Sequence, residues 1–269
     1  MTQRKYLAVI TDQHITEPGT RLYGLDTNTS ARGTFDSLKM ERLPELVVSL
    51  GDLADTTENP NRETATASRA SYTHAKNLLD GLKMPILTVA GNHDDPALME
   101  ESFPSAWEFQ KNGVTRYSFY GVDLISVDLR DGPGATGWIS EDTCETLNEV
   151  LADSKRAIIF SHFPFFELDN ERISSGLSVV NREALIQTIQ RHRDKILGCF
   201  SGHLHIWLSA TIDGIPVVSV PSSSFGFSLE PLSAERERVT SSPCGYLLIG
   251  VGEDGSLIIR PRFLPGADA

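Results

Sequence analysis

The chain has 269 residues, of which 40% are hydrophobic and 22% charged, and its formal net charge is −12. This composition is typical of a globular protein, and we expect a single domain over residues 1–269. The acidic balance disfavours a groove for a nucleic-acid polymer, although a small anion could still bind beside metal ions. No apolar run approaches the roughly 18 residues of a membrane-spanning helix, so we expect no membrane partner.

The first residues, MTQRKYLAVITD, place basic side chains before an apolar run, as a signal peptide would. The run stops at Asp12, short of the roughly 7–15 apolar residues that a signal peptide needs. We therefore predict a buried first strand and a cytoplasmic protein. Cys144, Cys199 and Cys244 form no disulfide or metal-binding pattern, which agrees with a reducing compartment.

In chain order, short apolar runs alternate with stretches of helical periodicity. Strands are predicted at 6–11, 46–50, 86–90, 114–121, 122–129, 157–162 and 196–203. Helices are predicted near 33–43, 63–83, 140–152 and 178–194. From Ser209 the chain is rich in β patterns, with hairpin turn signals at Asp213-Gly214 and Asp254-Gly255. This order favours two packed sheets with helices outside them over one parallel sheet.

Two long segments, 12–32 and 221–243, are predicted to be loops. Loops of this length without structure of their own are often functional. The second contains Phe225 and Phe227, and two interpretations stay open for it. It lines the substrate pocket as a cap, or it packs on a partner as an oligomer contact.

Five short polar motifs stand at the ends of predicted strands, where open α/β sheets place ligand sites. They are Asp12-Gln13-His14, Gly51-Asp52-Leu53-Ala54-Asp55, Gly91-Asn92-His93-Asp94, Ser161-His162 and Gly202-His203-Leu204-His205. Each alone has an ordinary explanation, such as a capping Asp or a turn. Together they contain five of the seven histidines, which packing alone does not explain. In extended backbone, residues two apart share a face, so each D-x-H or H-x-H pair can converge on one point.

Carboxylate, imidazole and amide groups without a thiolate suit Mn, Fe, Zn or Co rather than a structural zinc cage. The set of candidate ligands exceeds what one ion needs. We therefore predict two metal ions about 3.5–4 Å apart that share one carboxylate. Such a centre is typical of in-line displacement at phosphorus.

This order of motifs resembles the calcineurin-like metallophosphoesterase superfamily, and most closely its class III cyclic-nucleotide phosphodiesterases and related glycerophosphodiesterases. The resemblance covers residues 12–205 and extends to Arg21-Leu22-Tyr23-Gly24. It implies a four-layer α/β/β/α sandwich of two mixed sheets flanked by helices, with the dimetal site at the strand ends. The implied ligands are Asp12, His14 and His205 for one metal and Asn92, His162 and His203 for the other, with Asp52 bridging.

The resemblance also implies two catalytic roles. His93 would face the substrate and stabilise or protonate the leaving oxygen, and Asp55 would orient His93. Two departures from the wider superfamily make a phosphomonoester a less favoured substrate. Thr56 and Ala90 stand where protein Ser/Thr phosphatases carry arginines that grip a phosphomonoester.

We therefore expect a small-molecule phosphodiester as substrate, with 3′,5′-cyclic AMP first. A glycerophosphodiester is the first alternative, because the Arg21–Asn28 segment resembles the glycerophosphodiesterases as well. A broad range of diesters is the other, because the loops near 15–30, 165–177 and 221–230 contain no base-reading signature. A non-enzymatic scaffold is a weaker alternative because no ligand position is missing. A nuclease is weaker because the chain has no Lys/Arg-rich run. The resemblance leaves a homo-oligomer open.

Overall fold

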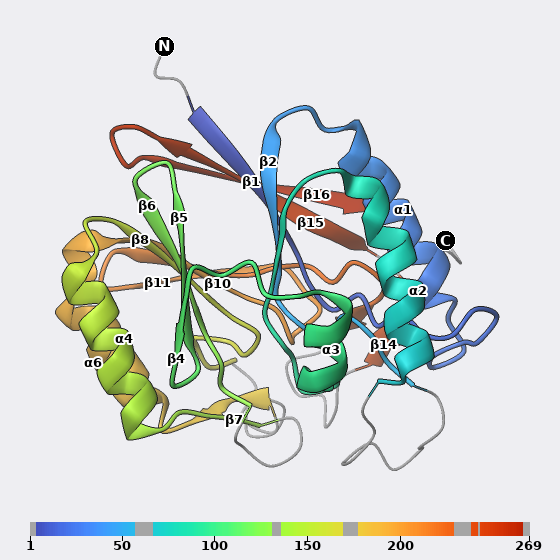
Figure 1. Ribbon diagram of the computed structural model, residues 1–269, viewed down its shortest axis with the longest axis horizontal. Helices are drawn as coiled ribbons and strands as arrows, with labels where there is room; N and C mark the ends of the chain where they lie inside the picture. The colour runs from blue at the N-terminus through green and yellow to red at the C-terminus, as the bar shows by residue number, and fades with distance from the viewer. Residues whose placement is uncertain are drawn as a thin grey trace.

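The structure is a computed structural model that describes residues 4–56, 67–130, 136–168, 177–228, 238–241 and 243–265. Two mixed sheets form its centre (Figure 1). The first contains, in order, β16 (Leu257–Leu264), β15 (Cys244–Gly252), β1 (Arg4–Ile10), β2 (Pro44–Ser49) and β3 (Ile86–Thr88). The second contains β11 (Leu208–Ile212), β12 (Ile215–Ser219), β10 (Ile196–Ser201), β8 (Ala157–Ser161), β6 (Val122–Val127), β5 (Val114–Phe119) and β4 (Phe109–Lys111).

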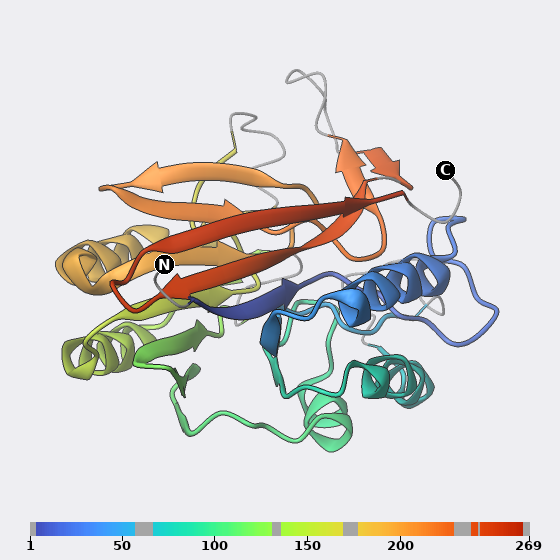
Figure 2. The same ribbon diagram turned by 90° about the horizontal axis from the view of Figure 1, so that it is seen from above.

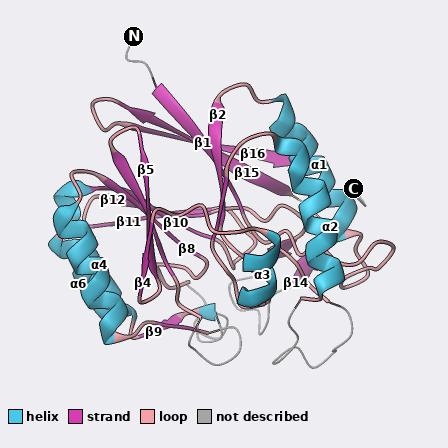
Figure 3. Ribbon diagram, viewed as in Figure 1, coloured by secondary structure: helices cyan, strands magenta, loops and turns pink. Residues whose placement is uncertain are grey.

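Helices cover the outer face of each sheet (Figure 3). They are α1 (Thr27–Met40), α2 (Arg69–Leu79) and α3 (Pro96–Ser102) on the first sheet, and α4 (Glu141–Asp153) and α6 (Arg182–Arg191) on the second. Seen from above, the two groups of helices lie on opposite sides of the paired sheets (Figure 2). The predicted four-layer α/β/β/α sandwich is therefore confirmed.

The alternation of side chains along each strand builds the layers. In β1, Ala8 and Ile10 pack with α1 and α2, whereas Leu7 and Val9 pack between the two sheets. In β8, Ile159 turns toward α4 and α6, whereas its neighbours join the layer between the sheets. Both faces of these strands are buried because helices cover one and a sheet covers the other, which explains their continuous apolar runs.

The predicted strands and both hairpins are confirmed, but several helix boundaries were wrong. The helix predicted near 33–43 begins at Thr27, because Asp26 caps it and polar side chains of its first turn are buried, which hides the apolar period. The helix predicted at 178–194 begins only at Arg182, because Val179–Val180 form β9 and pair with β7 (Gly137–Trp138). The helix α3 and the strand β4 were not predicted. Both are short, so their periodic signal is weak.

The segment 221–243 is not a plain loop. Its residues Gly226–Ser228 form β13 and pair antiparallel with β14 (Arg238–Thr240), while residues 229–237 and 242 lie outside the described residues. Whether the segment acts as a cap or an oligomer contact stays a prediction. Across the described part of the chain, no helix has both the length and the apolar character needed to cross a membrane.

Candidate metal centre

The five polar motifs come together at one edge of the two sheets. Strands β1, β2 and β3 of the first sheet run parallel to one another, as do β8 and β10 of the second, and each of these strands ends next to one motif. Several hydrogen bonds join the sheets at this edge, and two of them involve motif histidines directly. His162 Nδ1 donates to Leu50 O over 2.8 Å, and the backbone N–H of His203 donates to Asp12 Oδ2 over 3.0 Å.

All seven predicted metal ligands lie in this cluster, but the backbone reason given for their convergence was wrong. The pairs Asp12/His14 and His203/His205 are not extended. The members of both pairs, together with Asp52, have positive φ values between 42° and 68°. A left-handed conformation is uncommon for residues with a Cβ atom and is concentrated at functional sites. Tight turns after the strands, rather than strand geometry, therefore direct these side chains inward.

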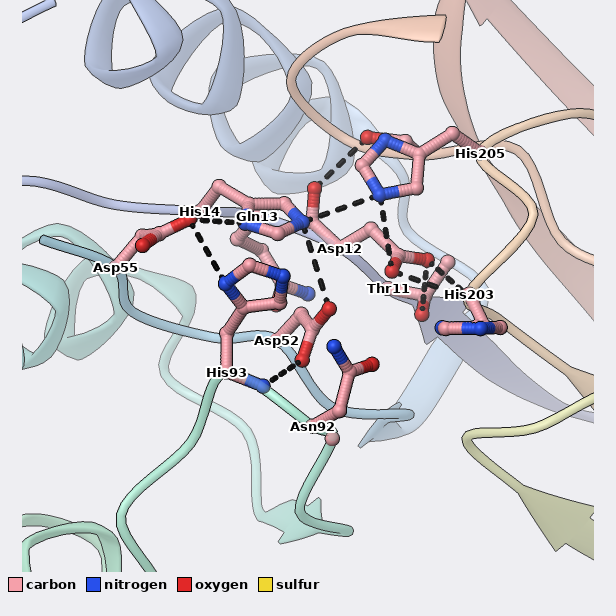
Figure 4. A network of polar contacts seen from close by, with 12 residues as sticks. Thr11, Asp12, Gln13, His14, Asp52, Asp55, Asn92, His93, His203 and His205 are labelled. Carbon is pink, nitrogen blue, oxygen red and sulfur yellow. Dashed lines mark hydrogen bonds and ion pairs between the residues drawn. The ribbon is translucent and has the colours of Figure 1, made fainter. Parts of the chain in front are cut away.

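One half of the cluster contains Asp12, His14, Asp52 and His205, whose ligand atoms all lie within 4.8 Å of one another. The Nε2 atoms of His14 and His205 are 3.1 Å apart. His205 Nε2 lies 3.3 Å from Asp12 Oδ1, and His14 Nε2 lies 3.6 Å from Asp52 Oδ2. Figure 4 shows these side chains pointing toward one another.

The other half contains Asp52, His162 and His203, with Asn92 beside them. His162 Nε2 lies 3.0 Å from Asn92 Oδ1, 3.2 Å from His203 Nδ1 and 3.4 Å from Asp52 Oδ2. Asp52 Oδ2 thus approaches a histidine of each half. A carboxylate in this position can bridge two cations.

Three histidines have one ring nitrogen held by an oxygen acceptor, which leaves the other without a proton when the ring is neutral. Nδ1 of His14 donates to Asp55 Oδ2 over 2.8 Å. Nδ1 of His162 donates to Leu50 O, and Nδ1 of His205 donates to Phe225 O over 3.1 Å. In each case Nε2 points into the cluster. These are the tautomers that present Nε2 as a metal ligand.

The arrangement fits metal cations. The facing nitrogens of His14 and His205 repel one another as neutral rings unless a proton or a cation lies between them. His203 Nε2 is buried and has no hydrogen-bond partner among the described residues. The donors are nitrogen and oxygen only, which suits Mn, Fe, Co or Zn and does not distinguish among them.

The pKa shifts of three groups favour the forms that bind metal. Burial would raise the pKa of Asp12, but the charge and hydrogen bond of His205 lower it to about 2. The pKa of Asp52 is lowered as well, because His162 and His93 outweigh the effect of its burial. Burial lowers the pKa of His203 to about 3. Charged carboxylates and neutral imidazoles are the ligand forms that divalent metals require.

His162 differs, because Asp52 raises its pKa to about 9 against the effect of burial. In the metal-free protein this histidine therefore carries a proton that a bound cation would displace. The same carboxylate that would bridge the ions holds this proton in their absence.

His93 lies at the open side of the cluster, with 16% of its side chain exposed. Its backbone N–H donates to Asp52 Oδ1 over 2.8 Å, and its Nδ1 lies 3.3 Å from Asp55 Oδ2 (Figure 4). Asp55 was predicted to orient His93 alone. The structure places it against His14 as well, so one carboxylate contacts both the candidate ligand and the candidate acid.

Sequence reasoning assigned no role to Asp94, although it belongs to a quoted motif. This buried carboxylate accepts hydrogen bonds from the backbone N–H groups of Leu53 and Gly91, at 3.1 and 2.8 Å, and from Tyr72 Oη, at 2.8 Å. It therefore ties the turn after β2 to the turn after β3. Burial and the charge of Asp52 raise its pKa to about 6. Tyr72 stands in α2 and carried no sequence signal.

Glycines allow the turns to approach this closely. A Cβ atom on Gly91 would lie 2.2 Å from Asp52 Oδ1, and one on Gly202 would lie 2.0 Å from Thr11 Oγ1. Neither position therefore accepts a side chain without moving a residue of the cluster.

Comparisons with known proteins agree with this geometry. Residues 6–207 match the family model described as calcineurin-like phosphoesterase. The chain is 28% identical to a probable cyclic nucleotide phosphodiesterase of Rhodopseudomonas palustris, over 90% of this chain and 93% of that one. It is 26% identical to the glycerophosphodiester phosphodiesterase GpdQ of Enterobacter lignolyticus, over 74% of this chain and 70% of that one. Among solved structures, a dimetal phosphatase from Danio rerio aligns with a TM-score of 0.70 and 18% identity, over 96% of both chains.

Proposed function

The chain belongs to the calcineurin-like phosphoesterase family, and on this premise we propose that it hydrolyses small organic phosphodiesters with two metal ions. The relatives named as phosphodiesterases support the reaction class. We take 3′,5′-cyclic AMP as the first substrate, because relatives named as probable cyclic nucleotide phosphodiesterases recur among the matches. Glycerophosphodiesters are the second candidate, because GpdQ is similar over most of its length.

The observation that carries this proposal is the pair of ligand groups that share Asp52. Asp12, His14 and His205 would hold one ion, and Asn92, His162 and His203 would hold the other. When bound, two ions supply charge neutralisation at the phosphoryl oxygens and lower the pKa of water. The buried candidate ligands would fix the positions of the two positively charged ions.

Side chains of the protein would orient the ester and protonate the leaving oxygen. His93 would reach the leaving oxygen, because it is the more exposed histidine beside Asp52 and its Nδ1 faces Asp55. With Nδ1 facing the Asp55 carboxylate, Nε2 would be the nitrogen that meets the substrate. Proton donation from Nε2 would stabilise a poor alcohol leaving group.

A diester is favoured over a monoester by charge. A diester carries one negative charge, whereas a monoester dianion gains from extra cationic groups. Thr56 instead donates its backbone N–H to Asp55 Oδ1, and Ala90 is buried just before Gly91. Neither side chain can supply the positive charge that a monoester phosphate prefers.

The test is a kinetic comparison of 3′,5′-cyclic AMP, glycerophosphoethanolamine, bis-(4-nitrophenyl) phosphate and 4-nitrophenyl phosphate with Mn, Fe, Co or Zn added separately. We expect higher kcat/KM for the diesters and loss of activity with a chelator. A clear preference for 4-nitrophenyl phosphate would overturn the diesterase proposal. Absence of all activity in protein that holds two ions would favour a scaffold role instead. Cleavage of single-stranded DNA at a higher rate than any small diester would favour a nuclease.

A further inference from the structure

An aromatic surface extends from the candidate metal centre toward solvent. Its innermost ring, Phe225, is buried and lies 5.1 Å from the ring of His14 and 4.3 Å from that of His205, measured between centroids. The next rings outward are those of Phe227, 4.5 Å from His205, and Tyr23, 5.6 Å from Phe225. Two separate segments, 22–25 and β13, therefore contribute rings beside the same two histidines.

Tyr23 is the outermost member and is held there by its backbone. Leu22 and Leu25 exchange two backbone hydrogen bonds of 3.0 and 2.8 Å, so Tyr23 and Gly24 are the central residues of a two-residue hairpin. Their φ values of 54° and 81° are those of a type I′ turn. A left-handed backbone conformation is disfavoured for a tyrosine. Because 47% of Tyr23 is exposed, burial of its ring does not explain why a tyrosine stands at this turn position.

On the basis of the proposed function, we propose that Tyr23 stacks on the base of a nucleotide substrate, with Phe227 bordering that subsite. The phosphoryl group would occupy the metal centre, and the base would lie over the exposed face of Tyr23. Stacking of this kind would add affinity for a nucleoside phosphodiester that a glycerophosphodiester, which has no ring, does not gain. An aromatic face is worth about 1–3 kcal/mol per base in single-strand recognition, and it tolerates any base.

A quaternary ammonium group, as in choline, is the other occupant that aromatic rings favour. A cage for choline needs several ring faces open to one point. Here Phe225 is 1% exposed and closes the inner side, whereas 47% of Tyr23 is exposed. A subsite with a closed inner side suits a flat base stacked on one ring better than a rounded cation that several ring faces must enclose.

The chain provides a matched pair of variants for the test. Tyr23→Asn removes the ring, and Asn-Gly is a favoured pair for the type I′ turn, so the hairpin is kept. Tyr120 and Gly121 form a similar turn between β5 and β6, with φ values of 49° and 79°. Tyr120 is 61% exposed and contacts Glu45 and Lys5, which belong to the opposite end of the sheets. Tyr120→Asn therefore controls for the loss of an exposed tyrosine at an Xaa-Gly turn.

We expect Tyr23→Asn to lower kcat/KM for 3′,5′-cyclic AMP by about 5- to 100-fold, mainly through KM. The change for ringless glycerophosphoethanolamine should stay within about twofold. Tyr23→Phe should retain wild-type values, and Tyr120→Asn should affect neither substrate. Equal losses on both substrates, no loss on either, or a selective loss on glycerophosphocholine would each overturn the base subsite.

A binding measurement separates failure of this inference from failure of the proposed function. Adenosine 5′-monophosphate and ribose 5-phosphate are titrated into the metal-loaded protein by calorimetry, which needs no turnover. We expect the nucleotide to bind about 5- to 100-fold more tightly, and Tyr23→Asn to remove this difference. Equal affinities in the wild type would overturn the base subsite even if diesters are hydrolysed. A selective nucleotide affinity in a protein without diesterase activity would retain the subsite and overturn the proposed reaction.

Discussion

Asp55 Oδ2 accepts a hydrogen bond of 2.8 Å from Nδ1 of His14, and both side chains are 2% exposed. The pKa of Asp55 is lowered, because its hydrogen bonds to His14 and His93 outweigh the effect of burial. The carboxylate is therefore charged and fixes the His14 tautomer. A histidine ligand held in this way is both better oriented and more basic toward a metal.

The first prediction follows from this contact. Asp55→Asn should weaken binding of a metal ion by about 10- to 100-fold, because the amide supports the His14 tautomer less well. Competition with a fluorescent chelator measures the affinity directly. Asp254→Asn is the control, because Asp254 lies in the surface turn between β15 and β16. Unchanged metal affinity together with a reduced rate would mean that Asp55 acts only through His93.

The second prediction concerns His93. His93→Ala should keep both metal ions but lower kcat by about 10²- to 10⁴-fold for substrates with alcohol leaving groups. The loss should be smaller for bis-(4-nitrophenyl) phosphate, whose leaving group needs little protonation. His192→Ala serves as the control, because His192 contacts Asn148 on the outer side of the second sheet. Equal losses for good and poor leaving groups would identify His93 as a positioning residue instead.

The third prediction tests the bridge. Asp52→Ala should lower the content of both metals and the activity together, because Asp52 Oδ2 approaches His14 in one half and His162 in the other. Elemental analysis of dialysed protein gives the stoichiometry. Retention of two ions per chain by this variant, or full wild-type activity with one ion, would contradict the two-metal centre.

The fourth prediction concerns Asp94 and can be tested without metal. Asp94→Ala should lower the free energy of unfolding by about 2–4 kcal/mol, because the N–H groups of Leu53 and Gly91 lose a buried acceptor. Tyr72→Phe removes one hydrogen bond to the same carboxylate and should cost about 1 kcal/mol. Urea unfolding of the metal-free proteins measures both. A change below that of Tyr72→Phe would show that Asp94 does not hold the two turns together.

The sequence by itself determined the architecture and the membership of the cluster. Continuous apolar runs predicted strands buried on both faces, and β1, β2, β8 and β10 follow those runs closely. The motifs at their ends predicted which residues would meet, because parallel strands place their carboxyl ends at one edge. The apolar periodicity that predicts a helix was weaker where polar residues of that helix are buried. The first turn of α1 was missed because Thr27 and Asn28 serve as buried hydrogen-bond partners of His14 O and Thr16 N.

Only the tertiary structure decided how the cluster is held and what surrounds it. The left-handed backbone at Asp12 and His14, the shared carboxylate of Asp55 and the acceptor role of Asp94 depend on contacts between segments far apart in the chain. The same holds for Tyr23 and Phe225, which are about two hundred residues apart in the sequence and in ring contact in the fold. Periodicity and motif spacing report on neighbours along one strand or helix. They carry no information on which loop packs over which strand end, because burial of distant side chains settles that choice.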